Sequence, residues 1–83
     1  MNLSKLAKDL LEHLYTNRNV DGTYHMEEPY ALATLFIIKY SEIIIAIEEL
    51  LESEFVVIAD KFTGVKITQD GISFAGRGMK FKY

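Results

Sequence analysis

The fold is decided by the stretch from Ser41 to Gly71, which reads SEIIIAIEELLESEFVVIADKFTGVKITQDG. Ser41 is a residue type that caps helices, and apolar residues then recur at helical spacing, at Ile43, Ile47 and Leu50. The apolar, β-branched run over residues 55–59 predicts a strand. Residues 60–64 supply a turn, and the alternation that follows predicts a return strand. The order is therefore a helix, a β-hairpin and a Thr-x-x-Gly segment.

Two further helices are predicted upstream of this stretch. The first follows a stripe of leucines and ends near Thr16, before a cluster of turn-forming residues. Its stripe consists of Leu3, Leu6, Leu10 and Leu14. Residues 23–26 are compatible with a short strand, and Pro29 favours the start of a second helix over 29–36, with 37–40 as a turn. A continuous helix stays open as an alternative, and the β-branched pair Ile37-Ile38 is also compatible with the start of a strand.

Two local motifs are similar to the winged helix-turn-helix superfamily, which has the same element order. Ala46–Val56, AIEELLESEFV, resembles the end of a recognition helix and the entry to the wing. Ile67–Gly71, ITQDG, resembles the Leu-Thr-x-x-Gly that follows the wing in many bacterial regulators, where Thr68 can cap the next turn and Gly71 relieves crowding. The resemblance implies an α+β fold. It also implies a single winged-helix domain over 1–75, with three helices and a C-terminal β-hairpin wing, and a flexible basic tail over 76–83.

The chain departs from the pattern of that family in two ways. Glu54 stands where family members commonly have glycine, so a left-handed turn there is mildly strained. The family also turns the outer face of the third helix towards the major groove. Here that outer face carries Ile44, Ile45, Glu48, Glu49 and Glu52. Glutamates repel phosphate, so this face is better suited to a protein surface or a self-contact than to DNA.

Composition narrows the class of protein. The 83 residues contain no cysteine and carry a net charge of −3, which excludes disulfides and thiolate metal sites. Residues 41–60 hold acidic side chains and no basic one, whereas from Lys61 onwards basic residues dominate. The apolar run 30–47 is interrupted by Lys39 and Glu42 and no signal peptide is evident, so we expect a cytoplasmic protein without a membrane span.

No catalytic set, phosphate-binding loop or cofactor motif is present in the sequence. His13 and His25, with Glu27 or Glu28, can in principle hold a metal ion, but their spacing matches no ligand motif. We therefore expect histidines of the surface or the core boundary, no metal, no cofactor and no small-molecule substrate.

The candidate site residues form two groups. The group able to contact DNA phosphates consists of Lys61, Lys66, Arg77, Lys80 and Lys82; the alternative is an ordinary charged, soluble tail. The candidate partner or dimer interface consists of Ile44, Ile45, Glu48, Leu51 and Phe62. Phe62, at the predicted wing tip, is expected to pack back on the hairpin; a partner contact is the first alternative, and insertion into a DNA minor groove as a wedge is the second. The remaining aromatic residues expected in or at the edge of the core are Tyr15, Tyr24, Tyr30, Phe36 and Tyr40.

Two functions follow, neither of them enzymatic. The first is a transcription-regulator-like DNA-binding domain, dimeric, that contacts DNA through the wing and the basic tail. It comes from the family resemblance. The second is a protein-interaction or dimerisation module that has lost DNA binding and uses the acidic, isoleucine-rich third helix. It comes from the charge of that helix.

Overall fold

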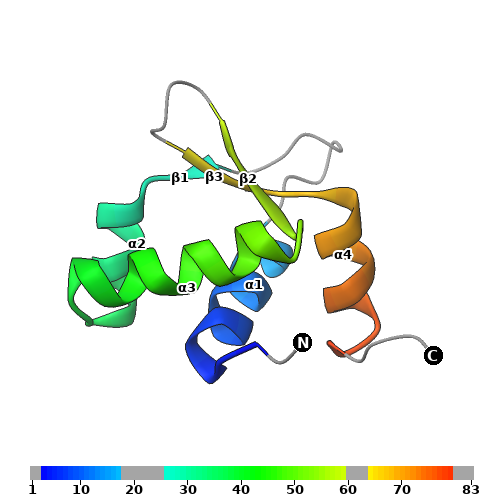
Figure 1. Cartoon of the computed structure of the whole chain (residues 1–83), viewed down its shortest axis with the longest axis horizontal. Coiled ribbons are helices and arrows are strands. Elements are labelled where there is room, and N and C mark those ends of the chain that lie inside the picture. Colours follow the sequence, from blue (N-terminus) through cyan, green and yellow to red (C-terminus); the bar gives the residue numbers. More distant parts are fainter. Residues whose placement is uncertain (1–2, 18–25, 60–63, 80–83) are drawn as a thin grey trace.

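The computed structural model describes residues 3–17, 26–59 and 64–79. The elements along the chain are α1 (Lys5–Thr16), β1 (Met26–Glu27), α2 (Pro29–Phe36), α3 (Tyr40–Glu52), β2 (Val56–Ala59), β3 (Gly64–Ile67) and α4 (Gln69–Gly76). The sheet lies along one side of the helices, with α2 and α4 at opposite ends of the domain (Figure 1). This is the predicted α+β winged-helix architecture, with a fourth helix added to the predicted three.

The sheet is antiparallel throughout, in the strand order β1-β3-β2. In the wing hairpin Val56 lies opposite Ile67 and Ala59 lies opposite Gly64, and β1 adds a third strand in which Met26 faces Lys66. The strand predicted over residues 23–26 is described only from Met26 onwards. The predicted turn residues 60–63 lie outside the described residues.

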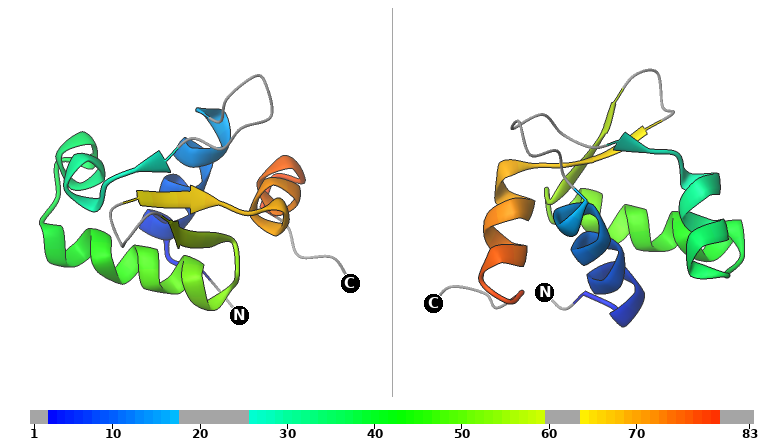
Figure 2. Two further views of the ribbon diagram at one scale, coloured as in Figure 1. Left: turned by 90° about the horizontal axis from the view of Figure 1, so that it is seen from above. Right: turned by 180° about the vertical axis from the view of Figure 1, so that it is seen from behind.

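The core is formed where the apolar stripes of α1 and α3 meet the inner face of the hairpin. Leu10, Leu14, Ile43, Leu50 and Val65 are fully buried there. Figure 2 (right), which shows the domain from behind, has α1 in front of α3 and below the sheet, and α4 packs beside α1. Every fully buried side chain of the described residues is apolar, so the folded state depends on packing.

The fourth helix exists because its first turn fits closely against the end of α3. The Thr68 hydroxyl accepts a hydrogen bond from the Gly71 amide at 3.0 Å and donates one to the Glu54 carbonyl at 2.7 Å. The Phe74 ring stacks on Phe55 with 4.5 Å between centroids. A Cβ at Gly71 would lie 2.2 Å from the Phe55 carbonyl oxygen. The predicted capping role of Thr68 and the crowding at Gly71 are both confirmed.

Three helices end in the same hydrogen-bond pattern. A left-handed residue stands at each of these ends: Ile37 (φ 56°) directly after α2, Glu54 (φ 63°) after the C-cap of α3, and Gly78 (φ 72°) after the C-cap of α4. At each end the left-handed amide bonds a carbonyl three residues back, and the next amide bonds one five residues back, as in the Schellman motif. Glu54 therefore has the left-handed backbone that is mildly strained for a residue other than glycine.

The start of α3 differs from the prediction. Ser41 is not the N-cap; α3 begins at Tyr40 and Lys39 holds the cap position, without a side-chain cap bond. The reason is the left-handed Ile37, because it ends α2 abruptly and turns the chain so that Lys39 is already extended (φ −72°, ψ 148°).

Candidate functional site

The candidate site is the helix-turn-helix unit made by α2, α3 and the three residues between them. The two helices are bent by 113° relative to each other, within the range of a helix-turn-helix. The turn predicted over 37–40 is confirmed at residues 37–39, with Tyr40 already in α3. We call this corner of the domain the elbow.

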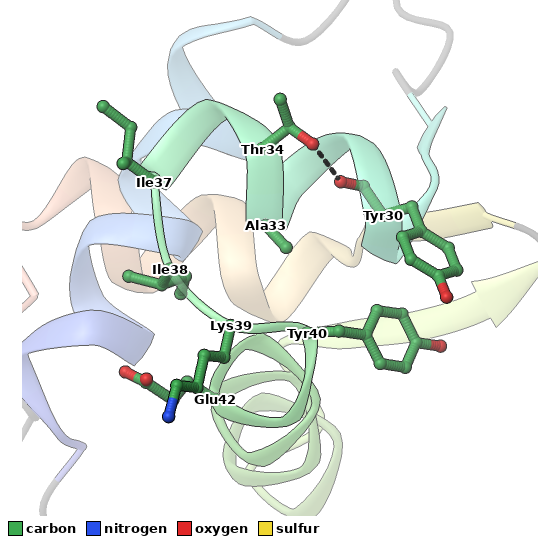
Figure 3. A pocket seen from close by; sticks show the side chains of 8 residues that line it. All are labelled: Tyr30, Ala33, Thr34, Ile37, Ile38, Lys39, Tyr40 and Glu42. Atoms are coloured by element: carbon green, nitrogen blue, oxygen red, sulfur yellow. Dashed lines mark hydrogen bonds between the residues drawn. The ribbon is translucent and has the colours of Figure 1, made fainter.

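An open groove of about 680 Å³ lies at the elbow. It is lined by Tyr30, Ala33, Thr34, Ile37, Ile38, Lys39, Tyr40 and Glu42. Figure 3 shows the Tyr30 and Tyr40 rings lying together on one side of the elbow, while Lys39 and Glu42 extend on the other side. The two rings are 4.4 Å apart between centroids.

The elbow exposes apolar side chains that the sequence interpretation assigned to the core. Tyr30 is 70% exposed and Tyr40 is 42% exposed, so the expectation of core or core-edge positions is wrong for Tyr30 and holds for Tyr40 only at the edge. Tyr30 follows the proline of the first turn of α2, on the helix side opposite to the buried Leu32. Tyr15 and Phe36 are partly buried against the core, as expected.

Ile37 is the least expected feature of the elbow. It is 90% exposed and sits in a left-handed conformation at φ 56°. That backbone is strained for a β-branched residue, and α4 uses glycine at the equivalent position. No local sequence signal predicted this conformation, because β-branched residues disfavour it; the pair Ile37-Ile38 was compatible with a turn or with the start of a strand.

The outer face of α3 is acidic with one apolar side chain at its centre. Ser41, Ile45, Glu48 and Glu52 are all exposed and follow one line along the helix; we call them the outer strip. Ile45 is 60% exposed. No residue of α3 carries a positive charge. The outer strip therefore combines one exposed apolar side chain, Ile45, with the exposed carboxylates of Glu48 and Glu52.

The structure separates the other predicted interface residues from this strip. Ile44 and Leu51 are partly buried and pack against the core. Glu49 turns towards the start of α1, where its carboxylate accepts hydrogen bonds from the Ser4 amide at 2.8 Å and the Ser4 hydroxyl at 2.7 Å. Of the predicted interface, Ile45 and Glu48 are thus the members on the open face; Phe62 lies outside the described residues.

The predicted phosphate-binding residues are not gathered at one point within the described chain. Lys66 lies in β3 and Arg77 is the C-cap of α4. The eight residues of α4 place about 12 Å of helix between them. Lys61, Lys80 and Lys82 lie outside the described residues. The exposed lysine at the elbow, Lys39, was not among the predicted contacts.

His13 takes part in a hydrogen-bonded contact between α1 and β1. Its Nε2 bonds the Glu27 carboxylate, its Nδ1 lies 3.1 Å from the Asn17 side-chain nitrogen, and its ring packs edge-on against Phe36. The expectation of a core-boundary histidine is confirmed for His13; His25 lies outside the described residues. Across residues 3–17, 26–59 and 64–79 no three histidine or acidic side chains gather as a metal-binding group.

Most of the exposed large apolar side chains belong to the helix-turn-helix unit. Among the described residues the exposed large apolar side chains are Tyr30, Leu35, Ile37, Tyr40, Ile45 and Val57. All but Val57 belong to α2, the elbow or α3. Several exposed apolar side chains on one structural unit are typical of an interaction surface.

Within the described ranges no single helix is both long enough and apolar enough to cross a bilayer. Only α2 and α3 taken together have the required length and composition, and these two helices are bent sharply at the elbow.

Comparison with known proteins places the fold. A scan against protein-family models and a search of curated proteins give no match. Among solved structures, the transcriptional regulator Tm0710 of Thermotoga maritima superposes with a TM-score of 0.74 over 90% of this chain at 14% identity. A variant of ZitR from Lactococcus lactis superposes with a TM-score of 0.70 over 94% of this chain, also at 14% identity. The chain spans about half the length of each, 50% and 51%. Both are winged-helix proteins, so the winged-helix fold is established.

Proposed function

We propose that this chain is a non-enzymatic, transcription-regulator-like winged-helix domain that binds DNA. One observation carries the proposal: a 113° helix-turn-helix and an antiparallel wing in the arrangement that a transcriptional regulator also has. A cytoplasmic location and a dimeric state belong to the same proposal.

The charge distribution determines which parts of the domain we expect to contact DNA. Exposed Glu48 and Glu52 repel the phosphate backbone along the outer strip. The attractive charges belong to the wing and to the tail, through Lys61, Lys66, Arg77, Lys80 and Lys82. Such contacts position the protein without reading bases, so we expect weak binding that is insensitive to sequence and steeply dependent on salt.

The test is fluorescence anisotropy with a labelled mixed-sequence duplex, titrated at low salt and again as salt rises. The double variant Lys80→Ala, Lys82→Ala removes two proposed phosphate contacts. We expect weaker binding and a log–log salt slope that is shallower by about 1.8, since each released phosphate contact contributes about 0.9.

The matched control is Lys5→Ala, Lys8→Ala, which removes the same charge from the exposed face of α1. A general charge effect would weaken both variants equally, whereas a tail contact weakens only the first. Undiminished affinity in the tail variant, or no binding by the unaltered chain at low salt, would refute the proposal.

A second function, a protein-interaction or dimerisation module, is favoured by a separate observation. The exposed large apolar side chains gather on the helix-turn-helix unit, where acidic side chains disfavour DNA. Because Ile44 packs against the core, Ile45→Glu is the sharper probe of this surface. Sedimentation velocity of Ile45→Glu should show loss of an assembly that the unaltered chain forms, with an unchanged circular dichroism spectrum. Unchanged assembly in that variant would rule out this use of the outer strip.

A further inference from the structure

Tyr30 and Tyr40 form an aromatic pair that joins the first turns of α2 and α3 across the elbow. Their ring centroids are 4.4 Å apart and the ring planes are tilted by 31°. Figure 3 shows both hydroxyl groups at the same outer edge of the pair. Both side chains are exposed, so a small reagent in solution reaches the two phenols together.

Helix packing holds the two rings in contact. Pro29 fixes the start of α2, and the Thr34 hydroxyl donates a hydrogen bond of 3.0 Å to the Tyr30 carbonyl. Leu32 of α2 and Ile43 of α3 are fully buried in one core, so the two helices cannot separate without opening that core. Groups held together in this way react with each other far faster than the same groups free in solution.

Two phenols in contact have a characteristic reaction, which is oxidative coupling. A one-electron oxidant takes one electron from each phenol, and each phenol releases its hydroxyl proton to water. The unpaired electron of each radical is shared between the oxygen and the ring carbons beside it, and two radicals combine by forming a carbon–carbon bond between these carbons. The hydrogen on each joined carbon then moves to the oxygen and restores the hydroxyl. The net change is the loss of two electrons and two protons.

We propose that Tyr30 and Tyr40 are an oxidative modification site, at which a one-electron oxidant links the two rings as dityrosine. The shared outer edge of the two hydroxyls brings the carbons beside them to the same side of the pair. The rings must close from contact to a bond of about 1.5 Å. Exposed side chains rotate readily, so this closure requires ring rotation and not movement of the helices. The proposal goes beyond both proposed functions and depends on neither.

Tyr15, the remaining tyrosine of the described residues, has a different environment. It is partly buried against the core, and its ring lies beside Gly76, where α1 meets α4. The core therefore shields Tyr15 from an oxidant in solution, whereas the elbow exposes its two phenols side by side. We expect the described chain to couple at the elbow and not at Tyr15.

The link acts on the helix-turn-helix unit itself. It closes residues 30–40 into a covalent ring that contains the whole turn, including the left-handed Ile37. A cross-link of this kind restricts the unfolded chain more than the folded one. Oxidation therefore fixes the angle between α2 and α3 and makes the elbow more resistant to opening.

Photo-oxidation of the full chain tests the proposal, with tris(bipyridyl)ruthenium and persulfate as the one-electron oxidant and no DNA present. Trypsin cleaves after Lys39, so the digest separates Tyr30, in peptide 19–39, from Tyr40, in peptide 40–61. We expect mass spectrometry to find these two peptides linked, with a combined mass lower by two hydrogen atoms. The linked fraction should stay the same when the protein is diluted, because the reaction takes place within one chain.

Phenylalanine variants identify the two rings. Tyr30→Phe and Tyr40→Phe keep an aromatic ring but remove the phenol, so each should lower the linked fraction about tenfold or more. Tyr24 lies in the same tryptic peptide as Tyr30, so Tyr24→Phe is the matched control and Tyr15→Phe is a second one; both should link normally.

Three results overturn the proposal. The first is a linked fraction in Tyr30→Phe equal to that of the unaltered chain, because the bond then involves another ring. The second is a linked fraction that falls in proportion as the protein is diluted, because the bond then joins two chains. The third is the absence of linked peptides under conditions that couple free N-acetyltyrosine.

Discussion

Replacing Gly71 by alanine tests the contact that sets α4 against the end of α3. The added Cβ would lie 2.2 Å from the Phe55 carbonyl oxygen and 2.8 Å from the Ile67 side chain. The carbonyl cannot yield freely, because it accepts a hydrogen bond of 2.9 Å from the Thr68 amide. We therefore expect α4 and the hairpin to move apart by most of an ångström.

The expected cost follows from three contributions. Inserting a methyl group into a well-packed site costs about 1–3 kcal/mol, and weakening the Thr68–Phe55 hydrogen bond adds a fraction of its net value of about 0.5–1.5 kcal/mol. Against this, alanine gains about 0.8–1.0 kcal/mol of helix propensity over glycine. The net prediction is a loss of about 0.5–3 kcal/mol in the free energy of unfolding, which lowers Tm by about 4–8 °C for each kcal/mol.

Urea denaturation followed by circular dichroism at 222 nm measures this loss. Gly76→Ala in the same helix is the matched control, because its Cβ would approach only the Tyr15 hydroxyl, at 3.4 Å. Gly76 does not have a positive φ, so alanine there should be neutral or stabilising by up to about 1 kcal/mol. If Gly71→Ala were as stable as Gly76→Ala, the close approach of α4 to Phe55 would be refuted.

Two further predictions concern helix ends. Ile37→Gly and Glu54→Gly should each raise the free energy of unfolding by about 0.5–1 kcal/mol, measured by urea titration. A left-handed backbone costs a non-glycine residue about 1–2 kcal/mol, and the larger conformational entropy that glycine loses on folding offsets part of the gain. Equal or lower stability in both variants would contradict the left-handed assignments. Ser4→Ala should lower the free energy of unfolding by about 0.5–2 kcal/mol. The Ser4 hydroxyl caps α1 by accepting a hydrogen bond from the Ala7 amide at 3.2 Å, and it also donates one to Glu49. An unchanged free energy of unfolding would show that this cap is not formed.

The elements that repeat a strong local pattern were predictable from the sequence. The leucine stripe gave α1, and the Ile43, Ile47 and Leu50 spacing gave the buried face of α3. The start of α2 at Pro29 was predictable because proline fixes φ and its missing amide donor is no loss in a first turn. In each case one residue type or one periodicity determines the local structure without help from distant residues.

The elbow was less predictable because tertiary context decides it. Ser41 looked like the cap of α3, yet the helix begins at Tyr40 since a left-handed isoleucine ends α2, a choice that β-branched residues disfavour. Nor could periodicity place Tyr30, whose exposure depends on which side of a short helix α3 covers. For the same reason Ile44 and Ile45, adjacent in sequence, have different roles: one packs on the core and the other faces outward.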